Sequence, residues 1–215
     1  MQQFFMTILQ ELSQLIFPNR CFGCSMLATS ICAACSTEWK AQHYLTKLDN
    51  FNVHSAVLYT PVAAKIILSA KENGLAGADE LLIQAIMGVL EKAKLDLQHF
   101  RLVPIPSSRQ SQRRRGRSFI VELTQEISDR TGISTLDCLT LTGKVADQSG
   151  LSRIQRLENM SGAFSMKRAA RGDLILIDDV ITTGATLKEA ARALNSQGFP
   201  AHISAITACV AQPLR

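Results

Sequence analysis

The amino-acid sequence predicts an α/β protein in which a domain built on a parallel sheet follows an N-terminal helix and a four-cysteine module. The first observation is the continuous apolar run Leu174–Ile177, which is typical of a strand buried on both faces of a parallel sheet. The second is the succession of short apolar strands and helical patterns along residues 56–197. The third is a pair of C-x-x-C motifs between Cys21 and Cys35. With 215 residues, 47% of them apolar, the chain suits one medium-sized domain with a small appendage.

The segment Met1–Phe17 is expected to form a helix, because its apolar residues recur at helical spacing until Pro18. The segment contains no Lys or Arg, and Gln and Glu interrupt its apolar run, so it does not resemble a secretory signal. The chain also lacks the run of roughly 20 apolar residues that a membrane span needs. We therefore expect this helix to pack on the protein itself, and we expect a cytoplasmic protein without a membrane span.

Four of the six cysteines lie close together in the sequence, as Cys21-Phe-Gly-Cys24 and Cys32-Ala-Ala-Cys35. Two tight turns of this kind supply the four thiolates that a structural Zn²⁺ ion prefers. An iron–sulfur cluster accepts the same set and stays open as an alternative, whereas disulfides are disfavoured without a secretion signal. We expect residues 1–50 to form the helix and the zinc-finger module, and residues 51–215 to form the main domain.

The elements of the main domain follow from short apolar runs and helical spacing. Trp39 and Tyr44 are expected in a helical segment that anchors the cysteine module. Strands are expected over residues 56–59 and 101–106, and helices over residues 62–70, 79–95, 119–130 and 187–197. Residues 107–117 contain five arginines and are expected to form a loop after a strand.

Positive charge is concentrated in the middle of the chain, although the whole chain carries a net charge of only +5. Residues 101–171 contain 13 basic and 6 acidic residues, which favours an anionic ligand there. Arg113, Arg115 and Arg117 are candidate ligands for a pyrophosphate, because guanidinium groups bind phosphate oxygens bidentately. Charge alone does not separate this site from a nucleic-acid interface or a solvated basic surface.

Two acidic residues and a small hydroxyl-rich segment follow the apolar run at residues 174–177. Asp178 and Asp179 are expected where the strand ends, at the sheet edge where ligands bind in open α/β sheets. The carboxylates suit sugar hydroxyls or Mg²⁺. The next segment offers backbone N–H groups and hydroxyls to a phosphate at a helix N-terminus; its residues are Thr182, Thr183, Gly184, Ala185 and Thr186. Residue by residue, a simple turn and helix cap explain the same pattern. The sequence contains neither a Walker A loop nor a G-x-G-x-x-G fingerprint.

Residues 174–186 resemble the phosphoribosyl pyrophosphate (PRPP) binding motif of type I phosphoribosyltransferases. Together with Cys21–Cys35, Val103–Pro106, Arg115-Gly116 and Gln148–Phe164, this motif makes the chain resemble the ComF family of competence proteins. The resemblance implies a type I phosphoribosyltransferase-like fold that binds PRPP with Mg²⁺. In that family the acidic pair lies by the ribose hydroxyls and the Thr/Gly loop holds the 5-phosphate.

The resemblance also implies a role in DNA uptake during natural competence, or in related nucleotide metabolism. As an enzyme the protein would displace pyrophosphate from PRPP by an acceptor that the sequence does not identify. The alternatives are a non-catalytic accessory factor that binds single-stranded DNA, with the PRPP site as a sensor or relic, and a purely structural zinc-finger scaffold.

The chain departs from the family pattern at two places. Lys71 matches a family lysine and joins the candidates for pyrophosphate or nucleic-acid binding, but Glu72 replaces the aromatic residue that commonly follows it. Arg117-Ser118-Phe119 likewise stands where the family often has Phe-Asn-Gln. The candidate catalytic residues are Arg153 and Arg156. They belong to the segment Gln148–Phe164, which could close over a ligand as a lid.

Overall fold

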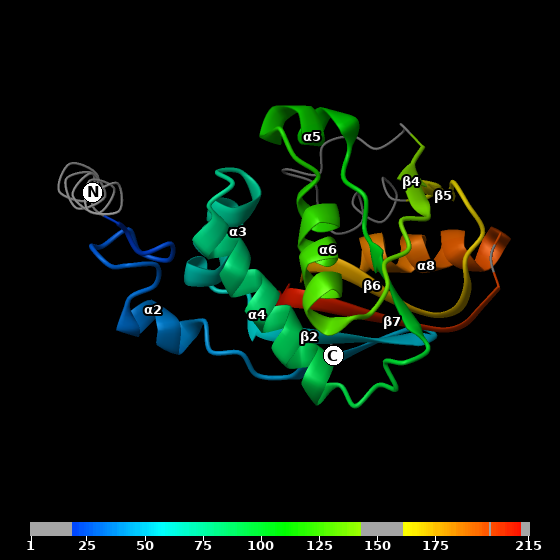
Figure 1. Cartoon of the computed structure of the whole chain (residues 1–215), viewed down its shortest axis with the longest axis horizontal. Coiled ribbons are helices and arrows are strands. Elements are labelled where there is room, and N and C mark those ends of the chain that lie inside the picture. The colour runs from blue at the N-terminus through cyan, green and yellow to red at the C-terminus, as the bar shows by residue number, and fades with distance from the viewer. Residues whose placement is uncertain (1–18, 143–160, 198, 212–215) are drawn as a thin grey trace, which may run out of the picture.

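Parallel strands form the centre of the computed structural model, which describes residues 19–142, 161–197 and 199–211 (Figure 1). The main sheet has the strand order β1-β2-β7-β6-β3, and β1 is antiparallel to β2 while the other neighbours are parallel. Its strands are β1 (Tyr44–Leu48), β2 (Phe51–Leu58), β3 (Phe100–Pro104), β6 (Arg171–Ile181) and β7 (Phe199–Val210). The prediction of a mixed α/β protein with a mostly parallel sheet is confirmed.

Helices cover both faces of this sheet. On one face lie α3 (Pro61–Lys71), α4 (Ala76–Lys92) and α6 (Phe119–Thr131), and on the other lie α8 (Ala185–Gln197) and a small hairpin of β4 (Leu139–Leu141) and β5 (Phe164–Met166). Figure 1 shows α4 and α6 in front of the sheet and α8 behind it. The short helices α2 (Ala33–Glu38) and α5 (Arg109–Arg115) lie in the cysteine module and after β3.

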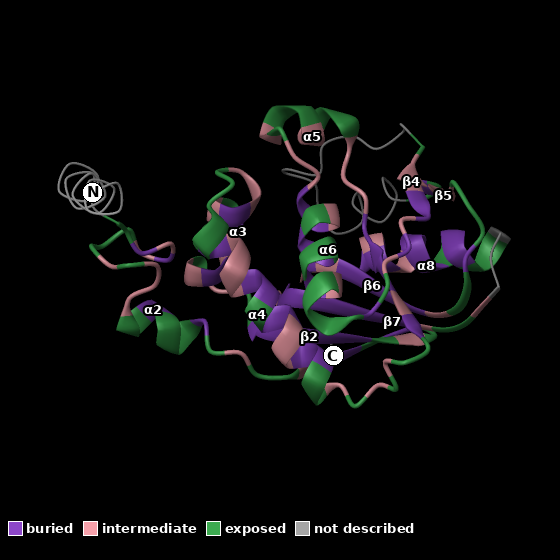
Figure 2. Cartoon of the chain, in the orientation of Figure 1, coloured by how far each residue is buried: buried purple, intermediate pink, exposed green. Residues whose placement is uncertain are grey.

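Strand β6 illustrates how the sequence builds two cores. Leu174 and Leu176 pack in the cluster that includes α8, whereas Ile175 and Ile177 pack in the cluster that includes α4. The alternation follows from the strand geometry, in which successive side chains point to opposite faces. All four side chains are fully buried, so this strand needs apolar residues at every position. The continuous apolar run in the sequence reflects this burial (Figure 2).

Local signals in the sequence fix several helix boundaries. Helix α3 begins at Pro61, and the side chain of the preceding Thr60 accepts a hydrogen bond from the Ala63 backbone N–H. Proline suits the first helical position because its missing N–H would have no partner there. Helix α6 ends at Thr131, and the left-handed backbone of the capping residue Gly132, with φ of 75°, favours glycine.

Three local expectations were wrong. Residues 109–115 form helix α5 rather than an arginine-rich loop, because Ser108 caps the helix start and Gly116 closes it in the left-handed conformation. Tyr44 begins strand β1 instead of continuing a helical segment. Strand β6 continues past Asp178 and Asp179 to Ile181, so these acids lie within the strand and not after it.

The described residues do not test every expectation from the sequence. The helix expected over Met1–Phe17 and the residues Arg153 and Arg156 lie outside the described residues. The division at residue 50 stays a prediction; strand β1, on its N-terminal side, pairs with β2 of the main sheet. Among the described residues, no helix combines the length and apolar character that crossing a bilayer requires.

Candidate functional site

Asp178 and Asp179 lie on a stretch of β6 that is paired on one side only. The ladder with β3 ends at Ile177, whose carbonyl accepts a hydrogen bond from the Ile105 N–H at 3.0 Å. The ladder with β7 continues to the end of β6. The two acids therefore lie beyond the end of the ladder with β3, at the carboxyl end of the parallel strands, where open α/β sheets bind ligands.

The two acids face opposite sides of the sheet, as neighbours on a strand do. Asp178 is half-buried and lines a hollow of about 20 Å³ together with residues 180–187, which include the predicted phosphate loop. Asp179 is buried and its Oδ2 atom lies 2.5 Å from the Nζ atom of Lys71, at the end of α3. Only Asp178 therefore shares a surface with the loop that the sequence predicts to hold a phosphate.

The electrostatic environments of the two carboxyls differ in the same way. Burial and the neighbouring Asp179 carboxylate raise the pKa of Asp178 well above its ordinary value. Burial alone would also raise the pKa of Asp179, but the Lys71 ammonium lowers it below the ordinary value. Burial opposes the charge of Lys71 too, yet the two carboxylates raise the pKa of Lys71. The pair of half-buried Lys71 and buried Asp179 is therefore ionised at neutral pH, next to a second carboxyl that resists ionisation.

The loop after β6 is held in a conformation that requires glycine. Gly184 has a φ of 77°, and a Cβ atom placed on it would lie 2.9 Å from the side chain of Leu48 in strand β1. The hydroxyl of Thr183 accepts a hydrogen bond from the Ala185 N–H at 3.3 Å, at the start of α8. The side chains of Thr182, Thr183 and Thr186 are half-buried. Packing of the loop against Leu48 in β1 thus fixes its backbone, while the threonine hydroxyls stay partly exposed to solvent.

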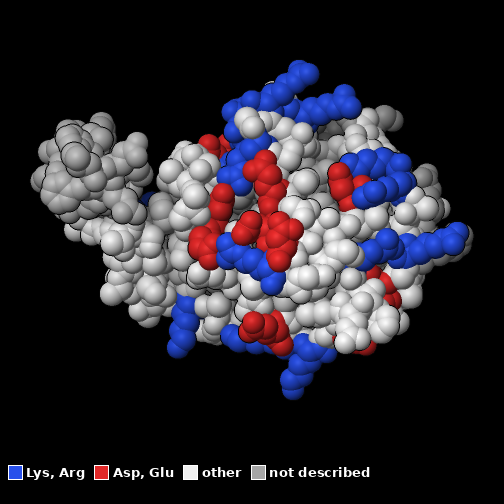
Figure 3. Space-filling view, viewed as in Figure 1, with Lys and Arg blue, Asp and Glu red and all other residues white. Residues whose placement is uncertain are grey.

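Acidic side chains already pair with two of the arginines that the sequence singles out. The Nε atom of Arg115 lies 2.8 Å from Glu72, which also contacts Arg114. Arg117 contacts Asp79 at 2.7 Å and Glu122 at 2.9 Å. Figure 3 shows acidic and basic side chains interleaved below the basic side chains at the top of the view.

The remaining arginines of this segment are oriented differently. Arg109 and Arg113 are exposed on α5, and neither makes an ion pair with another described residue. The structure therefore separates arginines that dock α5 on the body of the protein from arginines that face solvent. The docking partner Glu72 is the residue that replaces the family aromatic. Its arginine partners lie more than 40 positions away, so the sequence alone does not reveal this contact.

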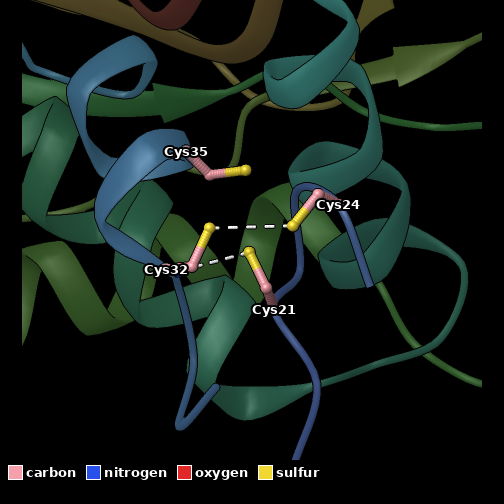
Figure 4. A group of neighbouring side chains, drawn as sticks. All are labelled: Cys21, Cys24, Cys32 and Cys35. Atoms are coloured by element: carbon pink, nitrogen blue, oxygen red, sulfur yellow. Dashed lines mark hydrogen bonds between the residues drawn. The ribbon is translucent and has the colours of Figure 1, made fainter. Parts of the chain in front are cut away.

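The four cysteines of the N-terminal module converge, as Figure 4 shows. The Sγ atoms of Cys21, Cys24, Cys32 and Cys35 all lie within 4.8 Å of one another. The Sγ atoms of Cys24 and Cys32 are 3.6 Å apart, close to the separation of about 3.8 Å that tetrahedral zinc–sulfur bonds of roughly 2.3 Å produce. All six cysteines of the chain are free thiols, so the cluster contains no disulfide.

Backbone N–H groups in the cluster favour the thiolate form of Cys21. The backbone N–H groups of Gly23 and Cys32 donate to Cys21 Sγ at 3.4 and 3.3 Å. Burial would raise the pKa of the Cys21 thiol, but backbone hydrogen bonds lower it to about 6. A Cβ atom on Gly23 would lie 2.8 Å from both Cys35 Sγ and a methyl group of Val62, so the turn has no room for a side chain. The residues fit a metal ion such as zinc held by four protein ligands.

The fold and these two sites define a mixed α/β protein with a cluster of four cysteines that could hold a metal ion and an acidic, loop-bearing edge of its parallel sheet. No family model matches the chain. The chain is 37% identical over 111 residues to Competence protein ComFC of Bacillus subtilis (strain 168), covering 51% of this chain and 44% of that protein. It is 33% identical over 102 residues to Competence protein F of Haemophilus influenzae, covering 45% of this chain and 44% of that protein. These similarities support membership of the ComF family, and the matched segments span less than half the length of either relative.

Proposed function

We propose that this protein binds PRPP at the carboxyl end of β6 and acts in a process related to natural competence. The observation that carries the proposal is that Asp178 and the loop of residues 182–186 line the same hollow. A carboxylate accepts hydrogen bonds from sugar hydroxyls, and loop N–H groups at a helix N-terminus hold a phosphate. A phosphorylated ribose needs both kinds of group side by side. The names of the two competence relatives support the cellular role.

As a phosphoribosyltransferase, the protein would replace pyrophosphate at C1 of the ribose by an acceptor. Thr182, Thr183 and the N–H groups of the loop would fix the 5-phosphate, and Asp178 would orient the ribose, so that binding aligns the reacting carbon. Mg²⁺ bound with PRPP would supply charge neutralisation to the departing pyrophosphate. Of the three arginines that the sequence predicted for pyrophosphate, Arg113 is the one that would join it, because Arg115 and Arg117 already contact carboxylates. Arg153 and Arg156 remain the candidate catalytic residues.

We propose for Lys71 a different role from the one that the sequence predicted. Its ammonium group lies against Asp179, so we propose that it holds this acid ionised beneath the ligand site and does not reach pyrophosphate. Asp179 then stabilises the end of β6, and Asp178 is the acid that meets the ribose.

Calorimetric titration of PRPP in the presence of Mg²⁺ tests the proposal. We expect saturable binding to the wild type and at least a tenfold loss in Asp178→Asn, since the amide keeps only one of the two acceptor oxygens of the carboxyl group. Asp173→Asn is the matched control, because Asp173 lies at the opposite end of β6 and contacts His202 at 3.0 Å. Equal affinity of the Asp178→Asn variant and the wild type would refute the assignment.

Helix α5 supports a second candidate function, a non-catalytic accessory factor that binds single-stranded DNA. Its Arg109 and Arg113 are exposed, and Figure 3 shows basic side chains gathered over this helix. Each arginine–phosphate contact adds about 1 to the slope of log affinity against log salt. We expect Arg113→Gln to reduce that slope by about 1, while Lys47→Gln, on the opposite edge strand β1, leaves it unchanged. A flat salt dependence in the wild type excludes this function.

A further inference from the structure

The four cysteines of the N-terminal module differ in how far they are open to solvent. Cys24 and Cys32 are half-buried, whereas Cys21 and Cys35 are only 2% and 4% exposed. Each C-x-x-C pair therefore contributes one open thiol and one closed thiol. The two open thiols belong to different turns, and Figure 4 shows their sulfur atoms facing each other.

The two closed thiols are held in place by their surroundings. The Sγ atom of Cys21 accepts hydrogen bonds from the backbone N–H groups of Gly23 and Cys32. The Sγ atom of Cys35 lies beneath Gly23, where even a Cβ atom would come within 2.8 Å of it. A reagent from solvent would have to displace this packing to reach either sulfur. The reactivity of cysteines follows their exposure, so the open pair is the reactive half of the cluster.

The sulfur atoms of the open pair are close enough to be joined. The Sγ atoms of Cys24 and Cys32 are 3.6 Å apart, and a disulfide bond of about 2.05 Å requires them to approach by about 1.5 Å. Cys24 lies in a turn and Cys32 directly precedes helix α2. Neither residue is inside a helix or strand of several hydrogen bonds, so a side-chain rotation and a small backbone shift suffice for this approach.

We propose that Cys24 and Cys32 form a reversible oxidation site, at which a peroxide converts two metal-binding thiolates into a disulfide. The first thiolate attacks the peroxide, so that an S–O bond forms, the O–O bond breaks and hydroxide leaves a sulfenic acid behind. The second thiolate attacks the sulfur of this acid and expels another hydroxide. The peroxide has then accepted two electrons from the two sulfur atoms, and solvent protonates both hydroxides to water.

The disulfide takes two of the four ligands away from the cluster. Cys21 and Cys35 alone do not close a tetrahedral site, so the metal is released and the module loses the ligand that supports its folding. A dithiol reductant returns two electrons to the disulfide and restores the four thiolates. The proposal requires a metal ion at the four cysteines, and it is independent of PRPP and DNA binding.

Stepwise addition of hydrogen peroxide to the zinc-loaded full-length chain tests the proposal. We expect about one zinc ion per chain to be released to a chromogenic chelator, while the free thiols of the denatured chain fall from six to four. Peptide mapping of the alkylated, unreduced protein should then show one disulfide, between Cys24 and Cys32. Dithiothreitol and added zinc should restore both the six thiols and the bound metal.

Two variants that keep the cluster intact serve as controls. Cys138→Ala/Cys209→Ala removes the two cysteines outside the module, both of which are buried. It should release zinc within about twofold of the wild-type rate and still lose two thiols. Met26→Leu removes a thioether that is 68% exposed beside the cluster. It should also release zinc as the wild type does, which separates thiol oxidation from methionine oxidation.

A second measurement needs no variant and therefore does not depend on whether a cysteine substitution folds. The zinc-loaded wild type is treated with less than one equivalent of N-ethylmaleimide and digested, and the labelled peptides are quantified. We expect Cys24 and Cys32 to be labelled at least about fivefold more than Cys21 and Cys35, because only the open pair is accessible.

Each result decides the proposal. A disulfide between Cys24 and Cys32 that forms together with zinc release and is reversed by dithiothreitol supports it. A disulfide within either C-x-x-C pair overturns the assignment, as does equal labelling of the four cysteines. Zinc release with only sulfinic or sulfonic acids overturns the reversible step. A chain that binds no zinc, or one that keeps its zinc in tenfold excess peroxide, overturns the proposal, whereas failure to bind PRPP bears only on the proposed function.

Discussion

The cysteine module and the sheet domain are held together by different forces. Helix α2 buries only Cys35, and the exposed side chains of Met26 and Leu27 lie at the tip of the first cysteine turn. Strand β6, in contrast, buries the whole run of residues 174–177 between two helical layers. Figure 2 shows this difference in burial. A module without a core of its own depends on its ligand, whereas a site at a sheet edge is formed before its ligand binds.

Among the changes considered, removal of a metal from the four cysteines should destabilise the protein most, and only in the cysteine module. Structural zinc contributes about 10–16 kcal/mol to the folding of small peptides at neutral pH, which is more than a module of this size can replace by packing. We expect chelation to unfold residues 19–43 and to leave the sheet folded. Trp39 is the single tryptophan, and it is buried against the main core. Its fluorescence should therefore shift to the red while the far-ultraviolet circular dichroism changes little.

Cysteine variants provide the control for chelation. Cys24→Ser should lower the zinc content and shift the Trp39 fluorescence without chelator. Cys138→Ala should do neither, because Cys138 is buried in the other core, under the β4–β5 hairpin. Loss of the sheet signal together with the metal would show that the two regions fold as one unit.

Loss of the ion pair between Lys71 and Asp179 should give the next largest decrease in the free energy of unfolding. Lys71→Met leaves the buried Asp179 carboxylate without its partner, and breaking a buried pair in this way costs about 3 kcal/mol or more. Lys188→Met is the matched control, since Lys188 pairs with Asp49 at 2.9 Å between exposed side chains and should cost below about 1 kcal/mol. Urea unfolding followed by circular dichroism measures both, and similar losses would contradict the role given to Lys71.

The pH dependence of this pair has a defined sign. The pKa of Asp179 is lowered in the folded state, so its stabilising contribution is present above the ordinary value of about 3.9 and is lost as the pH falls through the folded pKa. The pKa of Lys71 is raised, so its contribution is present below about 10.4 and is lost as the pH rises through its folded pKa. The difference between wild type and Lys71→Met should therefore be largest between these limits.

The parts of the fold that the sequence predicted are those set by local patterns. Burial on both faces of the sheet selects the apolar run at residues 174–177. Burial on one side selects the apolar spacing of the helix near residues 62–70, and metal ligation selects the cysteine pairs. Strand β1 carries no such signal, since its Lys47 is exposed and its pairing with β2 decides its conformation. Helix α5 was missed although Ser108 and Gly116 mark its ends, because its arginines have no apolar period.

In the candidate site, too, the sequence predicted the residues that are neighbours along the chain and missed the contacts between distant residues. The acids and the threonine loop are adjacent in sequence, so their proximity follows from the chain itself. The partner of Asp179 is 108 positions away, and only the packing of α3 on the sheet brings Lys71 to it. The opposite orientation of the two acids could have been predicted from strand alternation, had β6 been expected to continue to Ile181.

Gly184→Ala tests how firmly the sheet shapes the loop. The left-handed backbone of Gly184 costs an alanine about 1–2 kcal/mol, and the added Cβ would also press on Leu48. We expect a loss of about 2 kcal/mol in thermal or urea unfolding, together with weaker PRPP binding. Gly88→Ala is a control of opposite sign: Gly88 lies within α4 with open space around it, so alanine should stabilise by about 0.5–1 kcal/mol. A neutral Gly184→Ala would mean that the loop is not held in this conformation.

Asp178→Asn should have the smallest effect, and it should be stabilising. The pKa of Asp178 is raised by burial and by Asp179, so its ionisation at neutral pH opposes folding. Asparagine removes that charge and keeps the oxygen that accepts the Asp179 N–H at 2.9 Å. We expect a gain of about 1 kcal/mol in urea unfolding at pH 7.5 that vanishes as the pH falls below the ordinary value of about 3.9, where the wild-type carboxyl is protonated in both states. A destabilised variant at pH 7.5 would make Asp178 a structural residue, and a gain in stability with loss of PRPP binding would identify a carboxylate kept for its ligand.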